Sequence, residues 1–369
     1  MASHGVPRTA AVERTEQVKQ KELQQIDQYN ELVRLVNTKV SEEQYSTETL
    51  ALVSKLLTQN PEYYTIWNYR RLILQDTFKN ALAEPAIEPA ALSPGQQIIL
   101  DYIVNDLRFL VPLLLKFPKC YWIWNHRLWL LEQSTGQLPA SHARRLWQEE
   151  LGLVGKMLNR DSRNFHGWSY RRIVVAHLEQ LPAAETDQEA ERSGTSMTEP
   201  EFAYTTKMIN TNLSNFSAWH NRSKLIPRLL AERNADESAR RAFLAAEFEF
   251  IQRALYTDPY DQSLWFYHAY LMNTVDPDTP PEARICLDLD SGLPKETYDE
   301  QLESIKDMMD GAEDCKWIYQ ALLQCALALK AVSPDSVSED EMAAWLAELR
   351  KLDPLRSERW DDLSKKLNI

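Results

Sequence analysis

FPKCYWIWNHRLWLL, residues 117–131, is one of five related segments along this 369-residue chain, and their recurrence decides the fold. Each segment holds a Trp at its eighth position, with further aromatic and basic residues around it. Successive Trp residues lie 44 to 57 positions apart, a length that fits a helix, a turn, a second helix and a variable loop. The segments align on Trp67, Trp124, Trp168, Trp219 and Trp265, and two degenerate repeats follow around Trp317 and Trp360.

The residues before each segment predict the first helix of a pair. Residues 48–59, ETLALVSKLLTQ, carry apolar side chains at steps of three and four, which is typical of a helix with one buried face. The run stops at Asn60-Pro61, because Asn tolerates turn conformations and Pro opens the next segment with a fixed φ. With only 9 Gly in the chain, helices are further favoured. We therefore expect an all-α fold of stacked antiparallel helical hairpins.

The chain is expected to hold one helical-repeat domain over residues 16–369, preceded by a flexible N-terminal arm over residues 1–15. Chain ends are poorly ordered unless other contacts fix them, and binding could order this arm. The segments between repeats are rich in Ala and Pro or in acidic residues, so they are expected to be loops at the edge of the array.

Each repeat carries the same aromatic and basic positions. A large Trp in every unit predicts a core shared between neighbouring hairpins. The rings three residues earlier are expected on the same helix face as the Trp, packed over its indole. The Arg three residues later either binds a ligand or lies across aromatic rings and caps carbonyls; the structural role is favoured, because the Arg recurs in units that cannot all touch one ligand. The rings are Tyr64, Tyr121, Phe165 and Phe216, and the basic residues are Arg70, Arg127, Arg171 and Arg222.

Composition excludes several classes of function. The formal net charge of -13 argues against nucleic acid as a partner, because a polyphosphate attracts basic surfaces. The longest apolar runs are too short to span a bilayer, so an integral membrane protein is not expected. The four cysteines have no CxxC pairing and no His at ligand spacing, so they are expected to be reduced thiols in a cytoplasmic protein that holds no metal of its own.

The repeats resemble those of protein prenyltransferase α subunits. Within that family, DSRNFHGWSYRR, NLSNFSAWHNRSKLIP and DPYDQSLWFYHAYLM are most similar to the Rab geranylgeranyltransferase (type II) branch. No leucine-rich LxxLxLxxN series occurs, so the resemblance is to the compact fungal-type form. The resemblance implies a right-handed crescent wrapped around a prenyltransferase β subunit that carries zinc, and an α chain that is inactive without that subunit.

The resemblance also implies an activity. Enzymes of this branch transfer geranylgeranyl from geranylgeranyl diphosphate to C-terminal cysteines of a Rab GTPase presented by a Rab escort protein. The α subunit would scaffold the β subunit and dock the escort complex, and residues 200–300 are the expected docking region.

The family pattern also assigns candidate site residues. Lys119 and Tyr121 match the Lys-x-Tyr that family members place beside the diphosphate, and a fixed cation there would stabilise the leaving group. Asn164 and His166 occupy the next repeat's turn as candidate substrate-binding residues. His4 resembles the family's His-Gly N-terminus and is a candidate transient ligand for the β-subunit zinc.

Two alternatives remain open at this point. The α subunit shared by farnesyltransferase and geranylgeranyltransferase type I would have the same fold but would serve CaaX proteins. A non-catalytic helical-repeat scaffold of the tetratricopeptide type would have a period of about 34 residues, shorter than any spacing here.

Overall fold

The computed structural model describes residues 15–82, 92–182, 196–290 and 292–367, and every regular element in these ranges is a helix. The chain forms two compact units, residues 1–196 and 197–369. Each unit is built of helices that pack against their sequence neighbours as antiparallel hairpins, so the expected all-α class of stacked hairpins is confirmed. A single domain over 16–369 stays a prediction. Apart from Thr15, which caps the first helix, the arm over 1–15 lies outside the described residues.

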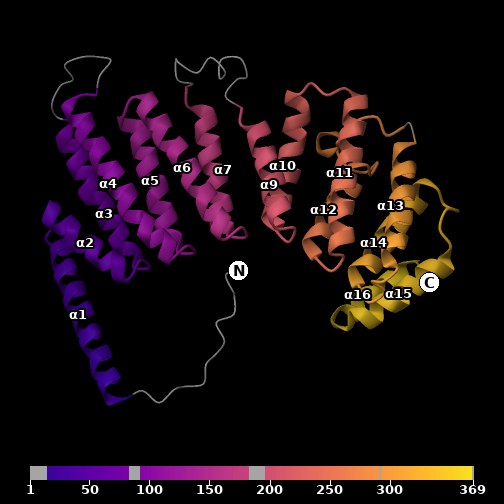
Figure 1. The fold of residues 1–369 in the computed structure, drawn as a ribbon, viewed down its shortest axis with the longest axis horizontal. Coiled ribbons are helices and arrows are strands. Elements are labelled where there is room, and N and C mark those ends of the chain that lie inside the picture. The colour runs from indigo at the N-terminus through magenta and orange to yellow at the C-terminus, as the bar shows by residue number, and fades with distance from the viewer. Residues whose placement is uncertain (1–14, 83–91, 183–195, 291, 368–369) are drawn as a thin grey trace. The chain divides into compact units, whose positions relative to one another are not determined.

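Within its described residues, the first unit holds one long helix and three hairpins (Figure 1). The long helix contacts the unit through its C-terminal half, where its buried residues Leu32 and Val36 lie. Tyr29 adds a polar contact, because its hydroxyl accepts a hydrogen bond from Asn60 Nδ2 at 2.8 Å. The helices are α1 (Glu16–Ser41), α2 (Thr47–Gln59) with α3 (Tyr64–Ala81), α4 (Pro94–Lys116) with α5 (Tyr121–Gln137), and α6 (Ala140–Arg160) with α7 (Phe165–Gln180).

Over residues 197–290 and 292–367 the second unit holds four hairpins. Two short 3₁₀ turns, η1 (Pro281–Ala283) and η2 (Pro354–Arg356), lie in its loops. The helices are α9 (Thr198–Thr211) with α10 (Phe216–Glu232), α11 (Glu237–Thr257) with α12 (Gln262–Thr274), α13 (Leu293–Met309) with α14 (Lys316–Val332), and α15 (Glu339–Leu352) with α16 (Ser357–Leu367).

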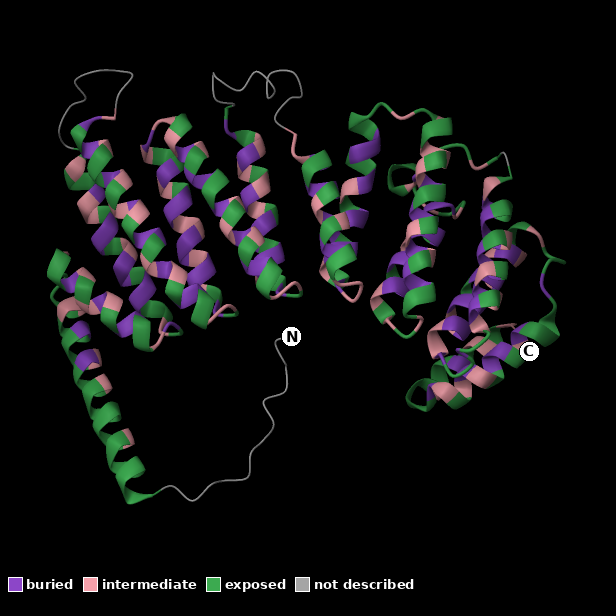
Figure 2. Ribbon diagram, in the orientation of Figure 1, coloured by how far each residue is buried: buried purple, intermediate pink, exposed green. Residues whose placement is uncertain are grey.

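Local sequence explains where several helices begin. Before α4, the Ser93 hydroxyl accepts from the backbone N–H of Gln96, whose side chain accepts from the Ser93 N–H, and Pro94 supplies a preset φ. At the starts of α2 and α11, the side chains of Ser46 and Asp236 accept from the backbone N–H three residues on. The buried faces of the helices then meet inside each unit (Figure 2).

The repeated Trp residues form the core, as predicted, and each also fixes the turn of its own hairpin. All five are at most 5% exposed. Each indole Nε1 donates a hydrogen bond to the backbone carbonyl six residues earlier, at 2.7–2.9 Å. One side chain therefore fills the core and also satisfies a buried turn carbonyl. The acceptors, in order, are Pro61, Pro118, Ser162, Leu213 and Pro259.

The sixth repeat differs from the prediction by two residues. Its second helix begins at Lys316, and the residue three positions later is Tyr319, the place that Trp holds in the first five repeats. The Tyr319 hydroxyl donates to the carbonyl of Glu313, six residues earlier, at 2.8 Å. Tyr319, and not Trp317, is therefore the anchor of this repeat. In the seventh repeat the predicted Trp360 does lie three residues after the helix start and is 2% exposed.

The rings three residues before each Trp do not pack over the indole, so that prediction is wrong. Tyr64, Tyr121, Phe165 and Phe216 are 49–66% exposed. Each is the first residue of its helix, and a helical side chain points toward the N-terminus of its helix. At the first position no preceding turn lies beneath the ring, so the ring projects beyond the helix end.

Candidate functional site

Three of the Arg residues after the anchors, Arg70, Arg127 and Arg222, are buried in ion pairs. Arg127 is 3% exposed and makes a two-pronged contact with Glu150, at 2.7 Å from Nε and 2.5 Å from Nη2. Its Nη1 donates to the carbonyl of Leu107 at 2.7 Å, and the Tyr170 hydroxyl donates to Glu150 at 2.8 Å. Glu150 lies on the first helix of the next hairpin, and Tyr170 lies on the second. This triad therefore joins consecutive hairpins.

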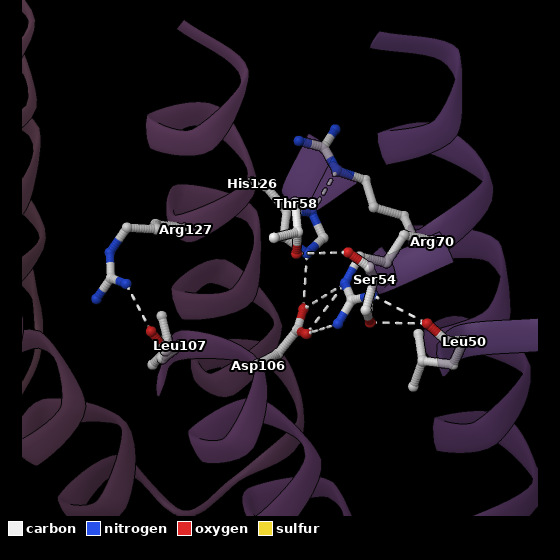
Figure 3. A network of polar contacts seen from close by, with 9 residues as sticks. Leu50, Ser54, Thr58, Arg70, Asp106, Leu107, His126 and Arg127 are labelled. Carbon is white, nitrogen blue, oxygen red and sulfur yellow. Dashed lines mark hydrogen bonds and ion pairs between the residues drawn. The ribbon is translucent and has the colours of Figure 1, made fainter. Parts of the chain in front are cut away.

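A second copy of this triad contains a histidine (Figure 3). Arg70 pairs with Asp106, and Asp106 Oδ2 also accepts from His126 Nε2 at 2.8 Å. Burial opposes ionisation of Asp106, yet the charge of Arg70 and the bond from His126 hold its carboxyl pKa well below the usual range. Burial lowers the pKa of His126 to about 4, so the imidazole is neutral at pH 7. Arg71 Nε donates to its other nitrogen, Nδ1, at 3.4 Å, which fits this tautomer.

The third copy is Arg222 with Glu247 and Tyr267 in the second unit. The guanidinium of Arg222 also lies over the ring of Phe202 at 3.8 Å. The structural role predicted for the Arg positions is thus confirmed at Arg70, Arg127 and Arg222. Sequence reasoning missed the acidic partners, although a signal exists: Asp106, Glu150 and Glu247 each stand eighteen positions before their repeat's anchor. In the sixth repeat this position holds the uncharged Gln301, which contacts His268.

Lys119 lies in the turn between α4 and α5, where sequence analysis placed the catalytic cation. Its side chain is 46% exposed. The Nζ atom lies 3.8 Å from Oδ2 of Asp161, the residue that ends α6. The turn of the second hairpin therefore adjoins the turn of the third.

Tyr121 and His166 lie beside this turn. Tyr121 begins α5, and its ring centroid lies 6.2 Å from the His166 ring on α7. Partial burial and, second, the positive charge of Lys119 lower the pKa of His166. The structure therefore brings the rings of Tyr121 and His166 together, and Lys119 stands two residues before Tyr121 in the turn that leads into α5.

A groove opens between α5 and α7 beside these residues, with a volume of about 220 Å³. Aromatic walls with a few polar groups are typical of sites that bind an apolar ligand with a polar end. The groove is lined by Tyr121, Trp124, Asn125, Leu128, Phe165, His166, Ser169, Tyr170 and Ile173.

Asn164 has a different setting from the other three residues. It is 3% exposed and caps α7, with Oδ1 accepting from the backbone N–H groups of His166 (3.0 Å) and Gly167 (3.3 Å). Its Nδ2 donates to the carbonyl of Pro118 at 3.0 Å. Asn164 therefore supports the Lys119 turn from the next hairpin, and a direct contact with substrate stays a prediction.

The same link recurs at other turns. The carbonyl of Pro61 accepts from Cys120 Sγ at 3.5 Å, and the carbonyl of Pro259 accepts from Cys315 Sγ at 3.1 Å. Burial raises the pKa of the Cys120 thiol to about 11, so it is protonated and able to donate at pH 7. These thiols serve packing between hairpins, in keeping with the prediction of reduced cysteines.

Metal and membrane features were searched over the described part of the chain. There, no three His, Cys, Asp or Glu residues gather as a metal ion would require. The described part of the chain therefore offers no residues that fit a zinc centre, and His4 lies outside that part. None of the helices present in those ranges combines the length and apolar character needed to cross a bilayer.

Comparison with known proteins identifies the family. Five copies of the protein prenyltransferase alpha subunit repeat match residues 46–77, 103–134, 147–178, 198–229 and 244–275. The fold is similar to that of a chain in the solved Candida albicans protein geranylgeranyltransferase-I complexed with GGPP. The TM-score is 0.61 at 19% identity, over 92% of this chain and 91% of that one.

Curated relatives give a finer assignment. The geranylgeranyl transferase type-2 subunit alpha of Saccharomyces cerevisiae is 31% identical over 97% of each chain. The protein of that name from Schizosaccharomyces pombe is 32% identical over 99% of this chain and 98% of its own length. The human protein of that name is 35% identical over 69% of this chain, which matches 39% of the human length. This chain therefore belongs to the family of geranylgeranyl transferase type-2 α subunits.

Proposed function

We propose that this chain is the α subunit of a heterodimeric Rab geranylgeranyltransferase. With its β subunit it would transfer geranylgeranyl from geranylgeranyl diphosphate to C-terminal cysteines of Rab GTPases presented by an escort protein. The observation that carries the proposal is an aromatic groove lined by Tyr121 and His166, whose ring centroids lie 6.2 Å apart, with Lys119 two residues before Tyr121 in the turn that leads into α5. The relatives named above support the type-2 assignment over the shared α subunit and over a non-catalytic scaffold.

Lys119 would act on the leaving group. As the bond between the isoprenoid carbon and the diphosphate oxygen breaks, negative charge grows on the diphosphate. An ammonium held nearby interacts more strongly with that charge in the transition state than in the ground state, so it lowers the barrier. The half-exposed Lys119 can reach a ligand outside the chain, and the exposed Tyr121 hydroxyl can donate a second hydrogen bond.

The β subunit is proposed to cover the exposed ends of the second helices in the first unit. Tyr64, Tyr121 and Phe165 all occupy the same repeat position and are 53–66% exposed. Tyr64 and Tyr121 each contact Trp122, with ring centroids 5.3 and 5.5 Å away, so the rings form a connected aromatic patch. Aromatic rings are enriched at the centres of protein interfaces. The zinc ion and the bound thiolate would belong to the β subunit.

The escort complex is proposed to dock on the second unit. A groove of about 360 Å³ lies between α10 and α12, within the range 200–300 that sequence analysis favours. Two exposed rings mark it, because Phe216 is 49% and Phe266 is 48% exposed, and their centroids lie 6.0 Å apart. Such a complex operates on proteins in the cytoplasm, which is the location we propose for the enzyme.

Reconstitution tests this proposal. The chain is co-expressed with a type-2 β subunit, and transfer from geranylgeranyl diphosphate is measured with a Rab–escort complex and with a CaaX peptide. Transfer to the Rab only with escort protein is the expected result. Transfer to the CaaX peptide alone would favour the shared α subunit, and stable assembly without transfer to either substrate would favour a scaffold.

A further inference from the structure

The contact between Lys119 and Asp161 joins the turns of two consecutive hairpins. Asp161 ends α6 and is 19% exposed, and its Oδ2 lies 3.8 Å from Lys119 Nζ. An ion pair between partly exposed side chains adds little to folding stability, because water screens it. The same ion pair also affects the position of the Lys119 side chain.

Asp161 also forms the turn before α7, and this second role uses the other carboxylate oxygen. Its Oδ1 accepts from the backbone N–H of Arg163, two residues on, at 3.3 Å. Other repeats make the same turn with the residue that ends the first helix, at 3.1–3.2 Å. These residues are Asn60, Asn212 and Asp258.

The turn therefore needs one side-chain oxygen as an acceptor, and in two repeats an Asn supplies that oxygen. Since Asn carries no charge, the carboxylate of Asp161 is not required for the turn itself. Its Oδ2 is the atom that faces Lys119. The turn that carries Lys119 has Phe117 at this position, so it offers no carboxylate of its own.

We propose that Asp161 is a positioning residue that holds the Lys119 ammonium beside the turn between α6 and α7, ready for the diphosphate. A lysine side chain is long and samples many rotamers in solution, so a fixed carboxylate narrows its range before substrate arrives. A diphosphate carries more negative charge than one carboxylate, so it attracts the Lys119 ammonium away from Asp161 when it binds. This inference rests on the function proposed for Lys119.

Asp161→Asn tests it in the reconstituted heterodimer with its Rab–escort substrate. The variant keeps the turn, because Asn makes the same turn at positions 60 and 212, and it removes only the charge. We expect kcat to fall about 3- to 10-fold, since misplacing a catalytic group costs rate. KM for geranylgeranyl diphosphate should stay level or fall, because a negative charge near the anion is lost. Asp161→Ser, which can also accept the turn bond, should reproduce the loss.

Asp258→Asn is the matched control. Asp258 makes the same turn bond, to the N–H of Tyr260 at 3.1 Å, in the second unit. This variant should keep the parental kcat and KM. Thermal unfolding of both heterodimers should match the parent, which separates positioning from folding.

A double-mutant cycle separates this inference from the function beneath it. In a Lys119→Ala background, Asp161→Asn should cause no further loss, because the side chain that it positions is absent. An equal loss of kcat in that background would overturn the positioning role alone. So would a parental kcat for Asp161→Asn when the Lys119→Ala variant is strongly impaired. A parental rate for Lys119→Ala would overturn both the positioning role and the proposed catalytic role of Lys119.

Discussion

The carbonyl oxygen of Pro118 accepts a hydrogen bond from Asn164 Nδ2 at 3.0 Å, which ties the turn before α5 to the start of α7. The same oxygen accepts from the indole of Trp124 at 2.9 Å. Lys119 is the next residue after Pro118, so its backbone is fixed from both its own hairpin and the following one. The position of the candidate catalytic cation is therefore a property of two hairpins together.

Asn164→Ala should weaken this support. It removes the cap of α7 and the bond to Pro118, so we expect a loss of about 2 kcal/mol in unfolding free energy. In the heterodimer kcat should fall while KM for geranylgeranyl diphosphate stays level, because Lys119 loses its fixed backbone. A raised KM with unchanged kcat would instead show that Asn164 contacts the substrate directly.

Asn215→Ala provides the control for that experiment. Asn215 caps α10 by accepting from the N–H of Ala218 at 3.2 Å, but its Nδ2 has no hydrogen-bond partner among the described residues. Only the cap is lost, so the unfolding free energy is expected to fall by about 1 kcal/mol. Equal losses for the two variants would contradict a stabilising link between Asn164 and Pro118.

Glu150→Ala should strongly destabilise the first unit. It leaves the buried Arg127 without its carboxylate, and breaking a buried pair from one side costs about 3–5 kcal/mol. Denaturant unfolding measures the change. Glu149→Ala is the control, because Glu149 pairs with Arg145 at the surface, where their side chains are 60% and 77% exposed, and little change is expected. A loss for Glu150→Ala as small as that of the control would be inconsistent with the triad as a stabilising unit.

His126 should make stability fall in acid. Its folded pKa is about 4, below the ordinary value of 6.5, so the unfolded chain binds the proton more readily. Stability is therefore full above about pH 7 and declines toward pH 4, by up to about 1.4 kcal/mol per pH unit. Asp106 adds to this loss only at lower pH, because its folded pKa is lowered and its ordinary value is 3.8.

His126→Gln keeps a donor toward Asp106 and removes the titration. The slope of unfolding free energy against pH between 7 and 4 should become shallower. An unaltered slope in His126→Gln would mean that another group causes the acid loss.

The register of the sixth repeat can be tested with two conservative changes. Tyr319→Phe removes the bond to the Glu313 carbonyl and should cost about 0.5–1.5 kcal/mol. Trp317→Phe removes no anchor bond and should cost less than Tyr319→Phe. A larger loss of unfolding free energy for Trp317→Phe than for Tyr319→Phe, measured by denaturant unfolding, would indicate that Trp317 is the anchor.

Sequence predicted the helical hairpins and five of the anchors because a large ring at a fixed place in every repeat has one simple use, a shared core. It also predicted that Arg127 and its equivalents are structural, since one ligand cannot touch them all. It misplaced the sixth anchor because the rule looked for Trp, whereas the turn carbonyl needs only a donor on a ring, which Tyr319 supplies.

Other features depend on how neighbouring hairpins pack, so the sequence of a single repeat does not reveal them. Glu150 lies on a first helix whose sequence varies between repeats, and an acidic residue is unremarkable in a chain of net charge -13. The pairing of Asn164 with Pro118, 46 positions apart, exists only when two turns lie side by side. Lys119, Tyr121 and His166 are predicted from family resemblance, and the structure adds the proximity of the Tyr121 and His166 rings.

The most direct test of the central claim is single-turnover transfer by the heterodimer carrying Lys119→Ala, with saturating geranylgeranyl diphosphate and Rab–escort complex. If the Lys119 ammonium stabilises the leaving diphosphate, the rate of the chemical step should fall about 10²- to 10³-fold while assembly with the β subunit is retained. A variant that assembles normally and transfers at the parental rate would contradict the account.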